Sequence, residues 1–205
     1  MAAEGDLITT ELGDGGRMSL DLDDLPSCVA CSLAGHRRNV VPGVGFGSSG
    51  ILIMGLGPGY SEDLAGAPFV GPAGKLLDRL LGMIQLSRED VYITNRIKCL
   101  PVDNKPTPEQ VGACEHWLRS EIQQVRPSVG ILLGQVAASY AFPGMSMREC
   151  SGLWTSKEGI TWTTTYHPAA VLRGQRELIT TIATVLAQAN SLATWLRRQP
   201  VAQSI

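Results

Sequence analysis

The sequence lacks any apolar run close to the roughly 20 residues that a membrane-spanning helix needs. Residues 1–15 are acidic and contain no basic stretch followed by an apolar one, so we expect no secretory signal and a cytoplasmic protein. Internal repeats and low-complexity blocks are also missing. At 205 residues, with 44% hydrophobic and 18% charged residues, the chain suits one well-buried domain and is not disordered as a whole.

Charge is small in total but unevenly placed. The net charge is −2, yet residues 1–25 hold seven acidic residues and one basic residue. Residues 26–205 then carry 16 basic and 12 acidic residues, a net charge of +4. We therefore predict an acidic flexible tail over 1–25 and a single domain over 26–205. A mildly basic domain is compatible with binding to nucleic acid, although the same charge is common in other enzymes.

Cysteine occurs five times, an odd number that makes a disulfide framework a poor explanation in a cytoplasmic protein. Cys28 and Cys31 are separated by two residues in a predicted loop. Cys99 follows a predicted strand, and Cys114 lies on a predicted helix. Two ligands at this spacing and two distant ones can close a four-cysteine site, for zinc or for an iron–sulfur cluster. Cys114 also fits a plain core thiol, and we interpret Cys150 as structural.

Strand-like and helix-like patterns alternate from residue 50 onward. The predicted strands cover residues 51–54, 91–94, 129–133 and 161–165. The predicted helices cover residues 73–86, 108–125, 135–142 and 176–198. Thr107 as N-cap, Pro108 at the first helical position and Gln110 in a capping box mark one helix start. This order predicts an α/β fold with a four-stranded, mainly parallel central sheet and helices on both faces.

Ligands of such folds bind beyond the carboxyl ends of the strands. The loops that follow the four predicted strands should therefore carry the chemistry. These loops are residues 55–70, residues 95–105, residue 134 and residues 166–173.

The first of these loops is rich in glycine. The run Gly55–Gly59 lets the backbone approach a ligand closely and exposes N–H groups to an anion, but a tight turn is an equally good interpretation. It matches neither a Walker A loop nor a dinucleotide-binding fingerprint. Further along, Phe69 lies among Gly and Pro residues, where its ring either stacks on a base or plugs the top of the core.

Two further polar residues follow predicted strands. Asn95 follows the second strand, and its amide can donate and accept hydrogen bonds at a nucleobase edge or simply form a turn. His167 follows the fourth strand, with Pro168 placed to begin a turn or helix. A ring nitrogen there can face a developing anion, although a lone histidine is more often structural.

Taken together, these segments resemble the motifs of family 4 uracil-DNA glycosylases. The matching segments, in chain order, are residues 55–59, 62–63, 66–74, 91–95, 98–99, 106–109 with Cys114, and 166–169. The resemblance runs from about Cys28 to about Arg173, with the motifs in the same order.

The resemblance implies a monofunctional DNA repair enzyme that hydrolyses the N-glycosidic bond of deoxyuridine after flipping the base out of the stack. We expect this enzyme to be a monomer. It implies a three-layer α/β/α fold. It also implies a 4Fe-4S iron–sulfur cluster, as a structural brace near the DNA, held by Cys28, Cys31, Cys99 and Cys114.

The resemblance also implies roles in the pocket. Phe69 would stack on the flipped uracil, Asn95 would hydrogen-bond its polar edge, and the main chain near Gly57 would add contacts. His167 would donate a hydrogen bond to the base oxygen that becomes negative. Glu62 would stabilise the sugar cation or orient the attacking water.

At the duplex, the resemblance places the segment Ala169–Arg173. Either Val171 or Leu172 would wedge into the gap that the flipped base leaves, and Arg173 would lie near a phosphate. Ala169 stands where the family often has serine, which removes a phosphate contact.

Three other positions depart from the family pattern. Leu56 stands where the family usually has glutamate, and Tyr60 and Ser61 replace residues that are typically acidic. Leucine cannot orient water, so Leu56 favours an alternative function, a non-catalytic or weakly active binder of uracil-containing or single-stranded DNA. An iron–sulfur electron carrier is a second alternative, but such a carrier has no need of the base-pocket residues.

Overall fold

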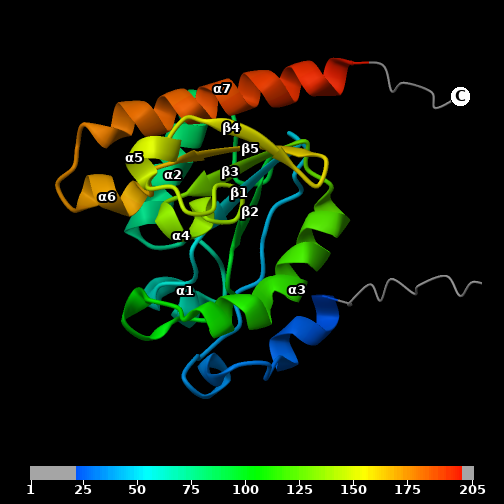
Figure 1. The fold of residues 1–205 in the computed structure, drawn as a ribbon, viewed down its shortest axis with the longest axis vertical. Coiled ribbons are helices and arrows are strands. Elements are labelled where there is room, and N and C mark those ends of the chain that lie inside the picture. The colour runs from blue at the N-terminus through cyan, green and yellow to red at the C-terminus, as the bar shows by residue number, and fades with distance from the viewer. Residues whose placement is uncertain (1–21, 200–205) are drawn as a thin grey trace, which may run out of the picture.

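Five strands form one central sheet in the order β2-β1-β3-β5-β4 in the computed structural model, which describes residues 22–199 (Figure 1). The strands are β1 (Ile51–Gly55), β2 (Tyr92–Asn95), β3 (Val129–Leu133), β4 (Trp154–Lys157) and β5 (Ile160–Thr165). Four of them, β2, β1, β3 and β5, run parallel, and β4 pairs antiparallel with β5 at the edge. The α/β class and the mainly parallel sheet are confirmed.

The helices pack on both faces of this sheet. They are α1 (Tyr60–Ala65), α2 (Pro72–Met83), α3 (Pro108–Val125), α4 (Gln135–Ala138), α5 (Met147–Cys150), α6 (Pro168–Leu172) and α7 (Leu178–Arg198). Short 3-10 segments cover Leu22–Ser27, Ser32–Gly35 and Val102–Asn104. Within residues 22–199, none of the helices has the length and apolar character needed to cross a membrane.

The start of α3 follows from its first residues. The Thr107 hydroxyl accepts the Gln110 N–H at 3.3 Å, and the Gln110 side chain accepts the Thr107 N–H at 2.9 Å. Pro108 takes the first helical position, where no N–H is needed. The predicted capping box is confirmed.

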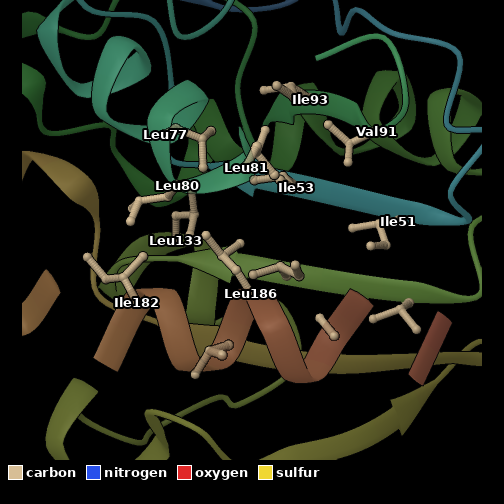
Figure 2. Close-up of a cluster of buried hydrophobic side chains, with 14 of the residues drawn as sticks. Ile51, Ile53, Leu77, Leu80, Leu81, Val91, Ile93, Leu133, Ile182 and Leu186 are labelled. Carbon is tan, nitrogen blue, oxygen red and sulfur yellow. The ribbon is translucent and has the colours of Figure 1, made fainter. Parts of the chain in front are cut away.

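The four parallel strands are buried on both faces because each face of the sheet has its own core. Ile51 and Ile53 of β1 point toward α2 and α7, and Figure 2 shows the side chains of these elements meeting in one core. Leu52 and Met54 point to the other face, where α3, α4 and α5 pack. Each fully buried Leu or Ile side chain contributes about 1.5–3 kcal/mol, so the two cores hold the strand ends rigidly in place.

The prediction of four strands was wrong by one, because β4 was missed. The strand β4 is mostly polar and half-exposed, so it carries no apolar pattern. A two-residue turn joins it to β5, with φ of 54° at Glu158 and 76° at Gly159. Positive φ at both positions is typical of a two-residue hairpin turn. The pair Glu158-Gly159 was the available signal for this turn in the sequence.

The predicted helix over 135–142 is also shorter than expected, since α4 ends at Ala138. Tyr140 and Phe142 are both buried in the same core. Residues two apart point in nearly opposite directions on a regular helix, so packing both rings requires the chain to leave the helix first.

Most of the predicted acidic tail, residues 1–21, lies outside the described residues. Residues 22–27 form a 3-10 helix whose Leu25 side chain is 1% exposed. Leu25 packs with Leu33 and Trp117 in a third, smaller core. Residues 22–25 therefore pack against the domain.

Candidate active site

A pocket of about 470 Å³ opens at the carboxyl ends of the parallel strands. It is lined by Leu56, Gly57, Gly59, Glu62, Phe69, Ala73, Asn95, Asn104, Leu133, Gly134, Gln135, Val136, His167, Ala169 and Arg173. All four predicted loops contribute to this lining, together with residues of the adjoining elements: Ala73 of α2, Leu133 of β3, and Gln135 and Val136 of α4. The parallel strand order brings them together, since the carboxyl ends of parallel strands share one edge of the sheet.

Glu62, in the first turn of α1, ties the glycine run 55–59 to the segment that follows Phe69. Its carboxylate accepts the N–H of Gly59 at 3.1 Å, of Val70 at 2.9 Å and of Gly71 at 2.8 Å. A Cβ atom at Gly59 would lie 2.8 Å from the Glu62 Oε2 atom, so glycine permits this close approach. The carboxylate thus fixes the glycine loop beside the Phe69 loop while it lines the pocket.

Phe69 adopts φ of 53°, a conformation that bulky residues rarely take. The Arg88 guanidinium donates to the carbonyls of Pro68 at 2.6 Å and Phe69 at 2.9 Å, and pairs with Asp78 at 2.8 Å. A Cβ at Gly74 would overlap the Phe69 carbonyl, so only glycine fits beneath it. The ring is 4% exposed and belongs both to the core and to the pocket wall, so the two interpretations of Phe69 are compatible.

Asn95 is the last residue of β2 and is 2% exposed. A Cβ at Gly55 would lie 2.5 Å from the Asn95 Oδ1 atom and 2.7 Å from Phe69 Cζ. A Cβ at Gly57 would lie 2.6 Å from the Ile97 side chain. Gly55 therefore leaves the space in which the buried amide and the aromatic ring meet at the pocket, and Gly57 leaves space for Ile97.

His167 is the N-cap of α6, and its Nδ1 atom accepts the Ala169 N–H at 3.1 Å. The acceptor nitrogen carries no hydrogen, so the neutral ring holds its hydrogen on Nε2. Burial, helped by the charge of Arg173 and opposed by Glu62, lowers the pKa of His167 to about 4. The ring stacks on Phe69 with centroids 5.5 Å apart and planes 21° apart. At neutral pH, His167 is therefore an uncharged hydrogen-bond donor at the pocket.

The helix α6 forms one rim of the pocket through Ala169 and Arg173. Its two candidate wedge residues differ in exposure. Leu172 is 52% exposed, whereas Val171 packs partly against the core beneath α2 and α7.

A second cavity lies next to the pocket, and all four predicted ligand cysteines line it: Cys28, Cys31, Cys99 and Cys114. Lys98 and Trp117 also line this cavity. Cys150 is buried elsewhere, in the core between the sheet and α3. Residues 22–199 contain no group of three or more His, Cys, Asp or Glu side chains already placed to hold a metal ion.

Three of the four sulfur atoms face N–H donors. Trp117 Nε1 donates to Cys28 at 3.2 Å, the Lys98 N–H donates to Cys114 at 3.3 Å, and Arg37 lies 3.7 Å from Cys99. Burial raises the pKa of Cys114 to about 11 and also raises that of Cys99. Four thiols on one cavity, with donors directed at sulfur, are a donor set that suits an iron–sulfur cluster or zinc.

Sequence reasoning missed several residues that shape the pocket. Arg88 lies 19 residues from Phe69, and no local pattern marks it as the clamp of that loop. Gln135 follows Gly134 at the end of β3, so the strand-end rule was a usable signal for it. Asn104 lines the pocket from within the predicted loop 95–105.

The fold and the pocket define an α/β protein whose strand-end pocket is lined by an aromatic side chain, a buried amide and a neutral imidazole. The model of the uracil DNA glycosylase superfamily matches residues 42–191. The chain belongs to this superfamily, and the resemblance found in the sequence is confirmed.

Several curated uracil-DNA glycosylases are similar to this chain over most of its length. The type-4 uracil-DNA glycosylase of Saccharolobus solfataricus is 41% identical over 75% of this chain and 77% of that protein. The type-4 enzyme of Thermotoga maritima is 39% identical over 77% of this chain and 84% of its own length. A type-5 uracil-DNA glycosylase of Pyrobaculum aerophilum is 31% identical over 73% of this chain and 74% of that protein.

Proposed function

We propose that this chain is a monofunctional uracil-DNA glycosylase of base excision repair, which hydrolyses the N-glycosidic bond of deoxyuridine in DNA and leaves an abasic site. The observation that carries the proposal is the state of His167, which is neutral, held through Nδ1 and left with an Nε2 hydrogen at the pocket. We expect the enzyme to act as a cytoplasmic monomer.

In this proposal the target base leaves the stack and enters the pocket. Phe69 stacks on the uracil ring, and the Asn95 amide pairs with the polar edge that distinguishes uracil from cytosine. The backbone at Gly57, which lines the pocket, adds a contact to the base.

Bond cleavage makes the sugar resemble an oxocarbenium ion and the uracil an anion. The Nε2–H of His167 donates to the uracil oxygen that gains the negative charge. A neutral imidazole suits this role, because it can donate the hydrogen bond without being protonated. Protonating the ring at this buried position would be costly.

Glu62 is the candidate for stabilising the sugar cation or orienting water. Three backbone N–H groups occupy most of its acceptor positions and hold the carboxylate still at the pocket. A fixed negative charge is already oriented when the cation forms, so no reorganisation is needed at that moment.

The helix α6 is the proposed contact with the duplex. Leu172, the more exposed of the two wedge candidates, would enter the gap left by the flipped base, with Val171 behind it. Arg173 would bind a phosphate, and Ala169 would approach the backbone of the DNA.

Cys28, Cys31, Cys99 and Cys114 would hold a 4Fe-4S cluster, since all four line one cavity with N–H donors directed at sulfur. When bound, such a cluster would act as a structural brace that links the N-terminal segment, the loop after β2 and α3. The residues of the pocket perform the chemistry.

The test is uracil release from a labelled oligonucleotide containing one uracil, with the thymine-containing oligonucleotide as control. Wild-type protein should release uracil, and His167→Ala should lower the rate by about 10²–10³-fold while DNA binding persists. No release by a cluster-loaded wild type would contradict the proposal.

One observation favours a second candidate, a binder that does not turn over. Leu56 lines the pocket and also packs against the core around the cysteines, where it offers no hydrogen bond to water. If wild-type protein binds uracil-containing DNA without release, and Leu56→Glu restores release, the chain is such a binder.

A further inference from the structure

A fully buried ion pair contacts the end of β2 through the Thr94 hydroxyl and the Asn95 carbonyl, on the side where α3 packs. The Lys98 side chain is 1% exposed and that of Glu121, on α3, is 0% exposed, with 2.6 Å between Nζ and Oε2. Neither residue lines the pocket. Removing two charges from water is costly, and a buried pair is weak evidence for stability by itself, so this pair calls for another explanation.

The pair is the centre of a saturated hydrogen-bond network. The Lys98 ammonium donates to Thr94 Oγ1 at 2.7 Å, to the Asn95 carbonyl at 2.7 Å and to Glu121, which uses all three of its hydrogens. The Thr94 hydroxyl donates to Glu121 Oε2 at 2.6 Å, and the Gly43 N–H donates to Oε1 at 2.8 Å. A network in which every group is satisfied specifies one arrangement of the strand end.

That arrangement includes the backbone of Asn95. Its carbonyl is held by Lys98, and the next N–H, of Arg96, donates to Gly55 at 3.0 Å. Because successive side chains of a strand point to opposite faces, Thr94 meets Glu121 while the Asn95 amide meets the pocket. Holding Thr94 and the Asn95 carbonyl from behind therefore sets the direction of the amide in front.

We propose that Lys98 and Glu121 are positioning residues that orient Asn95 for uracil recognition, an inference that rests on the proposed function. Lys98 also borders the cysteine cavity, where its backbone N–H donates to Cys114. Lys98 therefore lies between the two cavities: its side chain holds the Asn95 carbonyl beside the pocket, and its backbone borders the cysteine cavity.

The test separates recognition of the base from folding and from DNA binding. The variants are Glu121→Gln and the double variant Lys98→Met/Glu121→Gln, which removes both charges and so leaves no unpaired one. Glu109→Gln is the matched control, because it makes the same charge change at an exposed position of the same helix. For each holoprotein, the measurements are the inhibition constant of free uracil, the affinity for abasic-site DNA, the unfolding midpoint and the iron content.

We expect both variants to bind free uracil about tenfold more weakly, the effect of one misplaced hydrogen bond. Abasic-site DNA affinity and the iron content of Glu121→Gln should match the wild type, and Glu109→Gln should match it in uracil affinity, DNA affinity and iron content. Unchanged uracil inhibition in a folded variant would overturn the inference, as would a parallel loss of uracil and DNA affinity.

If the ion-pair variants do not fold, Thr94→Val provides the test. It removes one hydroxyl from the network, keeps the ion pair and preserves the shape of the side chain. A weaker uracil affinity with wild-type DNA affinity supports the inference, and an unchanged uracil affinity overturns it. Failure of the proposed function is distinguishable, because it shows as absence of uracil release by the wild type.

Discussion

The pocket and the cysteine cavity lie at opposite ends of one short segment, residues 95–99, yet they are held in different ways. Around the pocket, backbone N–H groups fix the catalytic candidates: three of them hold Glu62, and one holds His167. Around the cysteine cavity, Cys28 and Cys31 lie beside short 3-10 segments, and Cys114 lies on α3.

This difference shows what each region requires. The pocket is shaped by protein atoms alone, since strand ends, glycines and Glu62 define its walls. The cysteine cavity joins buried thiols, and burial favours their neutral form. Metal binding requires the thiolate, so the proposed cluster would couple the stability of that region to metal, whereas we expect the shape of the pocket to be independent of it.

The largest expected effect comes from a substitution that impairs the pocket and leaves the cysteine cavity intact. Asn95→Ala removes the amide that pairs with the base edge, and we expect uracil release to fall by about 10²–10³-fold. Iron content and the unfolding midpoint should stay near wild type, because the Lys98 contact is to the Asn95 backbone carbonyl. Single-turnover kinetics and iron analysis check this, and a parallel loss of iron would show that the two regions are not separable.

The second prediction concerns a substitution that disrupts the cysteine cavity. Cys114→Ser removes a proposed ligand and should lower the free energy of unfolding by about 3 kcal/mol, with loss of iron. Cys150→Ser is the control for iron content, because Cys150 is also buried but belongs to a different core from the other four cysteines. Thermal unfolding with iron analysis measures both, and wild-type iron content in Cys114→Ser would argue against a cluster at this site.

A smaller effect is expected from replacing Arg88, which holds the loop that carries Phe69. Arg88→Met removes two hydrogen bonds that hold the strained Phe69 loop and should cost about 2 kcal/mol of stability while weakening inhibition by uracil. Arg79→Met, at an exposed position of α2, is the matched control. If Arg88→Met loses stability but binds uracil like wild type, Phe69 does not depend on this clamp.

The smallest effect is expected from pH. Because the pKa of His167 is lowered to about 4, its ring stays neutral and the release rate should be flat from about pH 5 to about pH 8. The rate should fall as pH approaches 4. Stability should decline earlier, as pH falls from about 6.5 to about 4, since the unfolded chain binds a proton at higher pH than the folded one. A pH–rate profile with a step near pH 6.5 would contradict the buried, neutral histidine.

Several elements were predictable because local residues decide them. Thr107, Pro108 and Gln110 mark the start of α3, and β-branched or apolar runs mark the four parallel strands. The strand-end rule then located the pocket loops before any contact was known. The edge strand β4 was not predicted, because it becomes a strand through its pairing with β5 and not through its own composition.

The sequence by itself determined the alternation of strands and helices, the loops that carry the site and the residues that resemble those of the family, because these depend on local pattern. Only the tertiary structure decided which nitrogen of His167 carries hydrogen, how Phe69 is held and what lies behind Asn95. Arg88 and Glu121 act on residues 19 and 27 positions away along the chain. Contacts at such separations exist only once the sheet has brought the strand ends together, so no local pattern records them.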